Sequence, residues 1–379
     1  MTRPGTRSSG PREHLLLVGA GHSHLHLLLH AARLHEAGYD VTLVAPQYFF
    51  YSGAAAAVAT GHLPVAAARI DIARLAARSG VTHHVGRLAS LDPTERTART
   101  DDGTALHWDV ACLNLGSTTA WPTDTYAPGG TDTPPATVLR AKPLDDLGRL
   151  AELPLKPERP VVVVGAGASG VEIAAQLGVA RGPHHAGVML IEQRPQIAPG
   201  LPAAARRRLA AMLAERGVRI RTGRSVVALD ERGLLLDDGT DVAHAGVVLA
   251  SGLTAPAEVL AWGIGDADGI PVLPTLRHRD IPGLYATGDC AHFLADPLPR
   301  VGVHGVRQGP VLLDALLARR EGRPAPRYRP RRRHLAILDL GDGQALAVRG
   351  RLWWSGRTPL RLKRRIDRSW VARYSDSAR

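Results

Sequence analysis

Short apolar runs alternate with segments of helical periodicity through most of the chain. A strand, a glycine-rich turn, a helix and a second strand follow one another twice along the chain. The first set is expected at 14–18, 19–24, 25–37 and 41–44, and the second at 161–164, 165–170, 171–180 and 188–191. Strands that alternate with helices are typical of α/β folds with parallel sheets. The pattern therefore predicts two similar α/β units within one chain.

The first glycine-rich turn has the context of a Rossmann-like dinucleotide-binding loop. Gly19 permits a tight turn, and Gly21 lets backbone N–H groups approach a pyrophosphate at the start of the following helix. Two positions depart from the usual pattern, because a histidine stands at the third glycine position and an alanine where an acidic residue usually holds the ribose. The residues that we expect at this cofactor site are Gly19, Ala20, Gly21, His22, His24 and Ala45.

The second turn matches the dinucleotide-binding pattern fully. Glu192 ends the next strand, 27 positions after Gly165, where its carboxylate can accept both ribose hydroxyls and would repel a 2′-phosphate. The sequence therefore predicts NADH here in preference to NADPH. The expected residues are Gly165, Gly167, Ala168, Gly170, Glu192 and Gly252.

Composition excludes several classes of protein. Cys112 and Cys290 are the only cysteines, so neither a disulfide framework nor a four-cysteine zinc site is available, and a reducing cytoplasm is the simplest location. No apolar run approaches the roughly 18 residues of a membrane span. The net charge of +12 rests on 44 arginines against 3 lysines, dispersed until the last fifty positions, so we give the overall charge little weight. Residues 1–12 read as a disordered tail.

Three further landmarks follow in order: DVACLNLGS at 109–117, GVVLASG at 246–252 and IPGLYATGDCA at 281–291. Together with the two turns they resemble the pyridine nucleotide-disulfide oxidoreductase superfamily. That resemblance implies an FAD-binding domain formed by 13–142 and 271–330, an inserted NAD-binding domain at 143–270, and a small C-terminal extension at 331–379. It also implies that Gly116, Gly288 and Asp289 contact FAD.

Within this superfamily the chain resembles type II NADH dehydrogenases and sulfide:quinone oxidoreductases, and it resembles one further subfamily more closely. The segments GAGHSHLHLL, PQYFFYSG, VHGVRQGP, LDLGDGQALAVRG and KRRIDRSW resemble a subfamily associated with selenide, water dikinase. In VHGVRQGP, Gln308 matches the second glutamine of the quinone-side motif of type II NADH dehydrogenases, and His304 replaces the first. The resemblance therefore implies Gln308 as an FAD contact. A helix is predicted over 310–319, with its proline in the first turn and its positive end toward the flavin.

The absence of a closely spaced cysteine pair limits the reactions that this chain can catalyse. A disulfide reductase needs two cysteines at close spacing, and this chain has no such pair. The remaining function is hydride transfer from NADH to FAD, followed by electron transfer to an acceptor for which a quinone is the leading candidate. His304, Gln308 and Lys142 are the catalytic candidates, although Lys142 also suits an exposed linker. Two alternatives stay open: a sulfur or selenium redox enzyme that uses Cys290, and a non-catalytic sensor of FAD or NADH.

The histidines at 22, 24, 26 and 30 share helical spacing, but no acidic or cysteine ligand accompanies them, so we expect no metal. At the C-terminus, 334–351 predicts a strand pair around a turn at 341–343. The stretch 352–374 interleaves tryptophan and tyrosine with arginine. That composition suits peripheral contact with the inner face of a membrane, or a solvated basic face that packs its aromatic side on the protein. We expect no nucleic acid, and a homodimer is left open.

Overall fold

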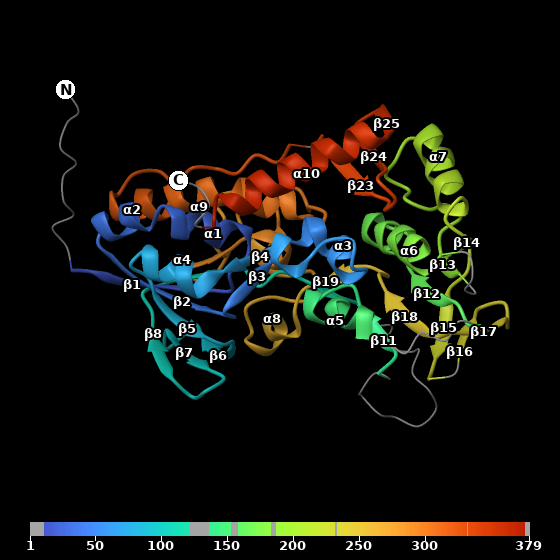
Figure 1. The fold of residues 1–379 in the computed structure, drawn as a ribbon. Coiled ribbons are helices and arrows are strands. Elements are labelled where there is room, and N and C mark those ends of the chain that lie inside the picture. The colour runs from blue at the N-terminus through green and yellow to red at the C-terminus, as the bar shows by residue number, and fades with distance from the viewer. Residues whose placement is uncertain are drawn as a thin grey trace.

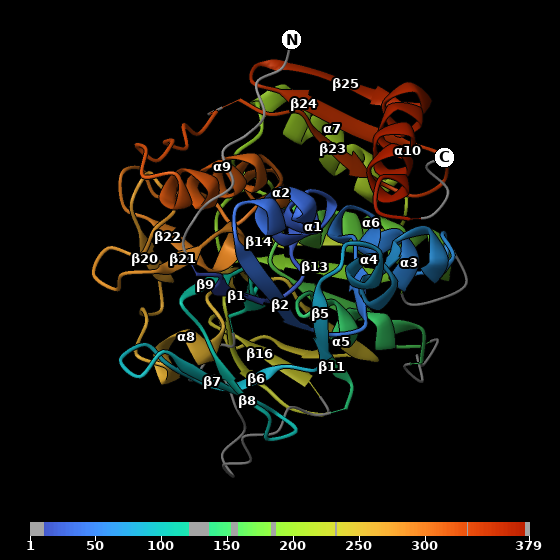
Figure 2. The same cartoon turned by 90° about the vertical axis from the view of Figure 1, so that its left-hand side faces the viewer.

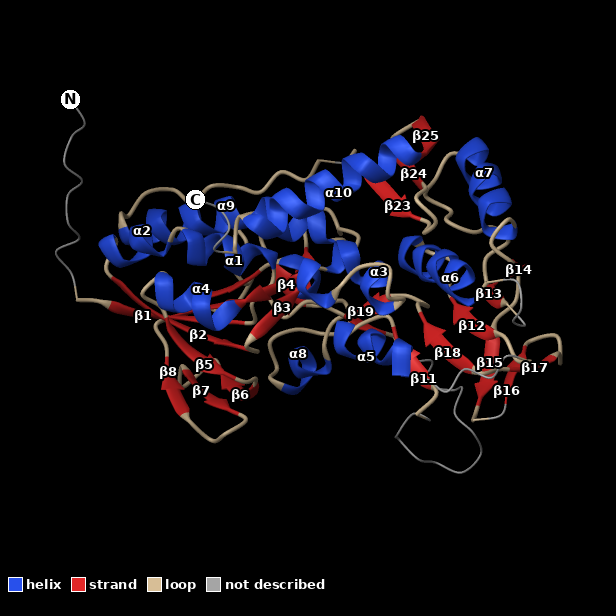
Figure 3. Cartoon of the chain, viewed as in Figure 1, coloured by secondary structure: helices blue, strands red, loops and turns tan. Residues whose placement is uncertain are grey.

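The computed structural model describes residues 11–120, 136–152, 158–182, 187–231, 233–331 and 333–375. The predicted N-terminal tail therefore lies almost entirely outside the described residues. The described chain forms two parallel sheets, each covered by helices, with a C-terminal segment that lies across both (Figures 1 and 3). The predicted α/β class with two nucleotide-binding units is confirmed.

The first sheet has five parallel strands in the order β21, β9, β1, β2, β5. Its strands are Leu284–Ala286, Val110–Leu113, Glu13–Val18, Tyr39–Ala45 and Thr82–Val85. The central strands are apolar and almost completely buried, as expected for a parallel sheet that is covered on both faces. The elements next to it are α1 (His22–Leu29), α2 (Ala31–Glu36), α4 (Ile72–Arg78), and the antiparallel strands β6 (Leu88–Asp92), β7 (Thr97–Thr100) and β8 (Ala105–His107).

The segment that follows β2 is made of short elements and leads back to the first sheet. In chain order these are β3 (Tyr48–Phe50), η1 (Ser52–Ala54), α3 (Ala55–Ala59), η2 (Val65–Ala67) and β4 (Arg69–Asp71). Strands β3 and β4 pair antiparallel. These elements place a cluster of aromatic and small apolar side chains beside the ends of the central strands.

The second sheet repeats the arrangement in the order β11, β18, β12, β13, β14, again all parallel. Its strands are Val138–Arg140, Gly246–Leu249, Val161–Val164, Val188–Glu192 and Val218–Thr222. Around it lie α5 (Leu144–Gly148), η3 (Arg149–Glu152), α6 (Ala168–Arg181), α7 (Ala203–Ala214), and the antiparallel strands β15 (Val226–Leu229), β16 (Gly233–Leu236) and β17 (Asp241–Ala243). Strand β11 belongs to this sheet, although it precedes the domain boundary expected after Lys142.

Two chain crossings join the units. Strands β10 (Thr118–Thr119) and β19 (Leu253–Thr254) pair antiparallel where the chain leaves and re-enters the first unit. The re-entering chain forms α8 (Ala257–Ala261), β20 (Ile270–Val272), η4 (Gly288–Cys290) and β22 (Ala291–Phe293). The β10–β19 pair thus lies where the first unit meets the second unit.

The helix predicted over 310–319 is longer than expected. Helix α9 spans Gly302–Arg320, so Pro310 lies inside it and not in its first turn. The three glycines at 302, 305 and 309 read as a turn in the sequence, because glycine is a poor helix former. Here they allow α9 to approach α1 closely, and Ser23 Oγ donates to the Gly305 carbonyl at 2.7 Å. Close packing between the helices thus outweighs the low helix propensity.

The C-terminal segment folds as a module of three antiparallel strands and one helix. The predicted strand pair is confirmed as β23 (Ala336–Asp339) and β24 (Ala345–Arg349), and β25 (Leu352–Gly356) and α10 (Arg357–Ala372) complete the module. Its sheet packs beside α6 and α7, whereas α10 extends over the first unit (Figures 1 and 2). No helix among the described residues has the length and apolar character that a membrane crossing needs.

Candidate active site

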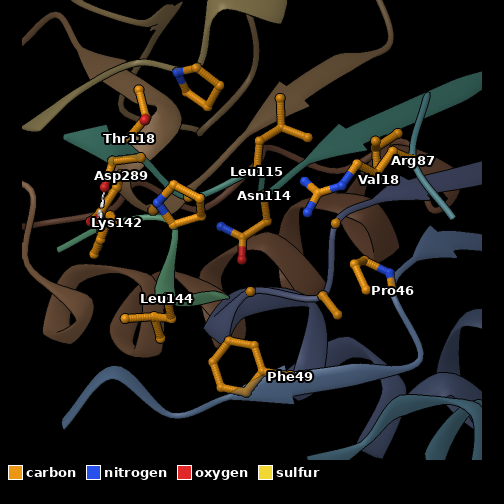
Figure 4. Close-up of a pocket in the computed structure, with 18 of the residues that line it drawn as sticks. Val18, Pro46, Phe49, Arg87, Asn114, Leu115, Thr118, Lys142, Leu144 and Asp289 are labelled. Carbon is orange, nitrogen blue, oxygen red and sulfur yellow. Dashed lines mark hydrogen bonds and ion pairs between the residues drawn. The ribbon is translucent and has the colours of Figure 1, made fainter. Parts of the chain in front are cut away.

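A cavity of about 550 Å³ lies at the carboxyl ends of the central strands of the first sheet (Figure 4). Its lining includes Val18 at the end of β1, Val44 and Pro46 at the end of β2, and Asn114 just after β9. This edge of a parallel α/β sheet is where ligands usually bind. The cavity therefore lies where the first glycine turn predicts a nucleotide.

The glycine turn forms one wall of the cavity. A Cβ on Gly19 would lie 2.5 Å from the Asn114 carbonyl oxygen, and one on Gly21 would lie 1.9 Å from Asn114 Oδ1, so only glycine fits at either position. Gly21 precedes α1 without any side-chain cap, which leaves the first backbone N–H groups of the helix for a ligand. Ala20 and His22, which the sequence predicts as cofactor contacts, also line the cavity. The buried Oδ1 of Asn114 has no hydrogen-bond partner among the described residues.

One end of the cavity holds a partly buried ion pair. Lys142 Nζ lies 2.7 Å from Asp289 Oδ2 and 3.0 Å from Ser117 Oγ, and Ser117 Oγ donates to the same carboxylate oxygen at 2.9 Å. The Lys142 side chain is 23% exposed and that of Asp289 is 8% exposed. Lys142 is thus held inside the cavity and is not an exposed linker charge. Gly116 and Gly288 line the cavity beside the pair.

Other walls of the cavity are apolar. Phe49, Phe50, Leu144 and Trp262 line the cavity, and in Figure 4 Phe49 and Leu144 lie on its lower side. The His22 ring contacts Phe49 edge-on, with 5.3 Å between centroids, and burial lowers the pKa of His22 to about 4. A neutral histidine and an aromatic wall suit a flat, largely apolar ring system.

Arg87 is a cavity residue that the sequence analysis missed. It follows β5, the parallel neighbour of β2, and it lies with Val18 and Pro46 at the end of the cavity remote from Lys142 (Figure 4). Ala45, the residue predicted there, is not among the lining residues, although Val44 and Pro46 on either side of it are. In the sequence, the only indication for Arg87 is that it closely follows strand β5. That position becomes informative only once the order of the strands in the sheet is known.

Three predicted residues lie behind the cavity wall. His24 is fully buried beneath the turn, with Nδ1 2.6 Å from the Gly19 carbonyl oxygen. Gln308 Oε1 accepts from the Gly288 N–H at 2.7 Å, and His304 Nδ1 lies 2.9 Å from the Tyr328 hydroxyl. None of the three is among the residues that line the cavity. Gln308 therefore supports the wall through Gly288, and His304 faces Tyr328.

The second glycine turn also connects a central parallel strand to a helix. A Cβ on Gly165 would lie 2.3 Å from the Ala250 carbonyl oxygen, and one on Gly170 would lie 1.9 Å from the Gly165 carbonyl oxygen. Gly167 has open space around it and precedes α6, which begins at Ala168 without a side-chain cap. An anionic ligand can thus approach the start of α6.

Glu192 lies beside this second turn. Its two carboxylate oxygens accept from the Ala166 N–H at 2.7 Å and the Arg194 N–H at 3.0 Å, and the residue is 6% exposed. The carboxylate is therefore fixed at the end of β13, where the sequence predicts ribose recognition. Gly252 lies at the crossing between the units, and its carbonyl accepts from the Ala120 N–H at 3.0 Å.

Both cysteines are buried and unpaired. Burial raises the pKa of Cys112, and it raises that of Cys290 to about 11, so neither thiol ionises near neutral pH. Cys290 Sγ lies 3.3 Å from the Thr287 carbonyl oxygen, and Cys290 does not line the cavity. Nucleophilic sulfur chemistry finds no support in these positions.

Comparison with known proteins agrees with this geometry. Residues 13–309 match the model of the pyridine nucleotide-disulphide oxidoreductase family. An NADH dehydrogenase-like protein of Mycobacterium tuberculosis is 30% identical over 246 residues, which are 60% of this chain and 59% of the relative. The type II NADH:quinone oxidoreductase Ndh of the same organism is 30% identical over 212 residues, 49% of this chain and 44% of its own. The matches thus span 59% and 44% of these two relatives.

Solved structures show the same fold at lower identity. NDH2 from Plasmodium falciparum, determined in complex with NADH, has a TM-score of 0.79 at 14% identity and covers 95% of this chain and 97% of its own. The sulfide:quinone oxidoreductase of Aquifex aeolicus has a TM-score of 0.77 at 16% identity, with 96% and 91% covered. Both similarities concern the architecture of two nucleotide-binding units.

Proposed function

This chain belongs to the pyridine nucleotide-disulphide oxidoreductase family, and from that premise we propose that it transfers hydride from NADH to FAD and passes the electrons to a quinone. The oxidoreductase class and the use of FAD and NADH agree with the family. The quinone is our proposal, and the similarity to a type II NADH:quinone oxidoreductase supports it. One observation carries the proposal: a single cavity joins an uncapped helix start to a partly buried ion pair.

The cavity lining supports one orientation for FAD in this proposal. The start of α1 suits the pyrophosphate, because its uncapped N–H groups and the positive end of the helix both favour an anion. The adenosine would then lie toward Pro46 and Arg87, and the flavin ring toward Leu144, Lys142 and Asp289. A flavin held here would accept hydride and release electrons.

The residues around the ring end would tune its charge. Lys142 is held by Asp289 and Ser117, and Gly302 and Gly305 bring the N-terminal turn of α9 to the same cavity. The Lys142 ammonium, which the Asp289 carboxylate partly offsets, and the start of α9 would both favour a ring that gains negative charge on reduction. Gln308 acts as a positioning residue through the Gly288 N–H. The roles of Lys142 and Gln308 are thus electrostatic and structural, and the protein need not supply a nucleophile.

NADH would bind at the second turn, with its pyrophosphate at the start of α6 and its adenosine ribose at Glu192. The carboxylate favours free ribose hydroxyls and repels a 2′-phosphate. Pairing of β10 with β19 and the shared lining by Arg140 and Lys142 bring the second unit to the ring end of the cavity. The nicotinamide can therefore approach the flavin from the second unit.

An anaerobic titration of the FAD-loaded protein tests the proposal. We expect NADH to bleach the visible flavin absorbance at concentrations well below those needed of NADPH, and a soluble quinone to restore it. Flavin that stays oxidised with both nucleotides would contradict catalysis and favour the sensor alternative. Bleaching by NADH without reoxidation by quinone would retain the NADH-dependent oxidoreductase and reject the quinone.

A further inference from the structure

A second cavity of about 300 Å³ lies directly beside the first, and Phe50 and Leu144 line both. Its other walls come from α3, the turn around η2, and α5. Helices α3 and α5 contact each other and lie side by side in Figure 1. The first unit and the second unit therefore each contribute one side of this cavity.

The lining of the second cavity is apolar. Apart from the Tyr51 hydroxyl, its side chains carry no polar atom: Phe50, Ala55, Val58, Ala59, Val65, Ala68, Leu144 and Leu147. The Tyr51 hydroxyl already donates to Asp367 Oδ1 at 3.0 Å. A charged or strongly polar ligand such as sulfide, a carboxylate or the nicotinamide ring of NAD would lose its hydration here without compensation. The lining selects a hydrophobic ligand.

The position of the cavity matters as much as its lining. The shared residue Leu144 follows Lys142 by two positions, at the end of the first cavity that holds the Lys142–Asp289 pair. In the FAD orientation proposed above, that end contains the flavin ring. A ligand in the second cavity would then be separated from the ring by the side chains of Phe50 and Leu144. Val65, which is 50% exposed, opens the other side toward solvent.

We propose that the second cavity binds the electron acceptor, a quinone that carries an apolar chain, with the chain leaving past Val65. The proposal rests on the proposed function. The overall reaction is NADH + H⁺ + quinone → NAD⁺ + hydroquinone: the hydride carries two electrons and one proton, and solvent supplies the second proton. His304 and Gln308, where the family resemblance would place the acceptor, line neither cavity.

Two variants block the cavity in different ways. Val58 is partly exposed on α3, and Val58→Trp would fill the cavity with an indole ring. Val65→Asp would place a charge at the opening, at a position exposed enough to accept one. The matched controls are Val227→Trp and Val227→Asp, because Val227 is 42% exposed on β15, in the antiparallel sheet of the second unit, and lines neither cavity.

The first measurement is direct binding of decylubiquinone to the oxidised, FAD-loaded protein. Binding is detected as quenching of the flavin fluorescence. The second is the rate of flavin bleaching by NADH, which involves no quinone. We expect each cavity variant to raise the dissociation constant of decylubiquinone by at least about tenfold, since a blocked apolar pocket loses its ligand contacts. We expect the bleaching rate to stay within about twofold of wild type, and the Val227 variants to match wild type in both measurements.

The outcomes separate this proposal from the proposed function. Wild-type affinity for decylubiquinone in both cavity variants overturns the cavity assignment, even if wild-type protein reduces quinone. An equal loss in the Val227 controls also overturns it, because the effect would not depend on the cavity. Wild-type protein that NADH cannot bleach contradicts the proposed function itself.

Discussion

His24 stands where a third glycine is usual, and its ring is built into the fold beneath the glycine turn. It is completely buried, and burial lowers its pKa to about 4 despite the contact with the Gly19 carbonyl. In the folded protein this ring is therefore neutral at pH 5, whereas in the unfolded chain it is mostly protonated. Between pH 6.5 and 4 the unfolded state binds more protons at this position, so stability falls as the pH falls.

We predict that His24→Gln reduces this acid sensitivity. The amide can still donate to the Gly19 carbonyl but cannot titrate, so the loss of unfolding free energy between pH 6.5 and 4 should shrink by about 3 kcal/mol. Urea unfolding at a series of pH values measures the difference. His107→Gln, at a side chain that is 58% exposed, serves as the control. An unchanged pH dependence in His24→Gln would show that the ring is not neutral in the fold.

Lys142 gives a second prediction at the scale of single residues. Lys142→Met leaves the buried Asp289 carboxylate without its ammonium partner at the ring end of the cavity. We expect FAD to bind about tenfold more weakly, as is usual when a buried charged hydrogen bond loses one partner. Fluorescence titration with FAD measures the change, and Arg208→Met, in an exposed pair with Glu215, is the control. An unchanged affinity for FAD in Lys142→Met would show that Lys142 does not contribute to binding of the cofactor.

The sequence predicted those residues of the candidate sites that can be recognised from their immediate neighbours along the chain. Gly19, Gly21 and Glu192 were predicted because a strand, a turn and a helix follow one another along the chain. Arg87 and Asn114 were missed because their place depends on which strands lie side by side. Gln308 was assigned to the cofactor from a family motif, but its side chain contacts the Gly288 backbone.

At the scale of elements, the packing of α1 against α9 depends on small residues of α9. Gly305 and Gly309 on α9 face Ser23, His22 and His26 on α1. The small residues that permit close approach thus lie on α9, far along the chain from the turn. For the same reason the start of α9 could not be predicted, because its glycines are favourable only in the presence of α1.

Gly309→Ala tests this packing. The added Cβ would lie 2.8 Å from His26 Cβ and 3.4 Å from the Ser23 backbone, positions that cannot move without shifting α1. We expect a loss of about 1–3 kcal/mol in the free energy of unfolding, measured by urea denaturation, as for other overpacked sites. Gly200→Ala has open space and should lie within about 0.5 kcal/mol of wild type. Equal stability of the two variants would refute the close contact.

At the scale of the whole molecule, the C-terminal module ties the two units together. Asp339 N–H donates to Glu172 on α6, and Arg216 contacts the Leu340 carbonyl, which fixes the module to the second unit. On the first unit, the Trp370 ring stacks on Tyr51 at 4.6 Å between centroids. Lys363 donates to the Gly53 carbonyl at 2.6 Å. The predicted packing of the aromatic side against the protein holds for Trp370 and Tyr374, which are buried.

The outer side of α10 remains basic, and it carries apolar side chains as well. Leu362 and Ile366 are 37% and 44% exposed among arginines, and Leu352 and Trp354 on β25 are 73% and 37% exposed. We predict that the protein binds vesicles with anionic lipid and not purely zwitterionic ones, because such a surface combines apolar burial with charge attraction. Arg364→Glu with Arg365→Glu should weaken binding at least about tenfold in a sedimentation assay, with Arg207→Glu and Arg208→Glu on α7 as the control. Equal binding of both double variants would reject this surface.

The order of strands in the first sheet also has a consequence during translation. Its edge strand β21 comes from residues 284–286, and β9, which it pairs with, comes from 110–113. Asp289 and Gly302 of the proposed flavin site are made later still. A ribosome that adds about 5–20 residues per second will have synthesised most of the chain before that site exists. If flavin binds at the proposed site, a nascent chain stalled within the second unit should emerge without it.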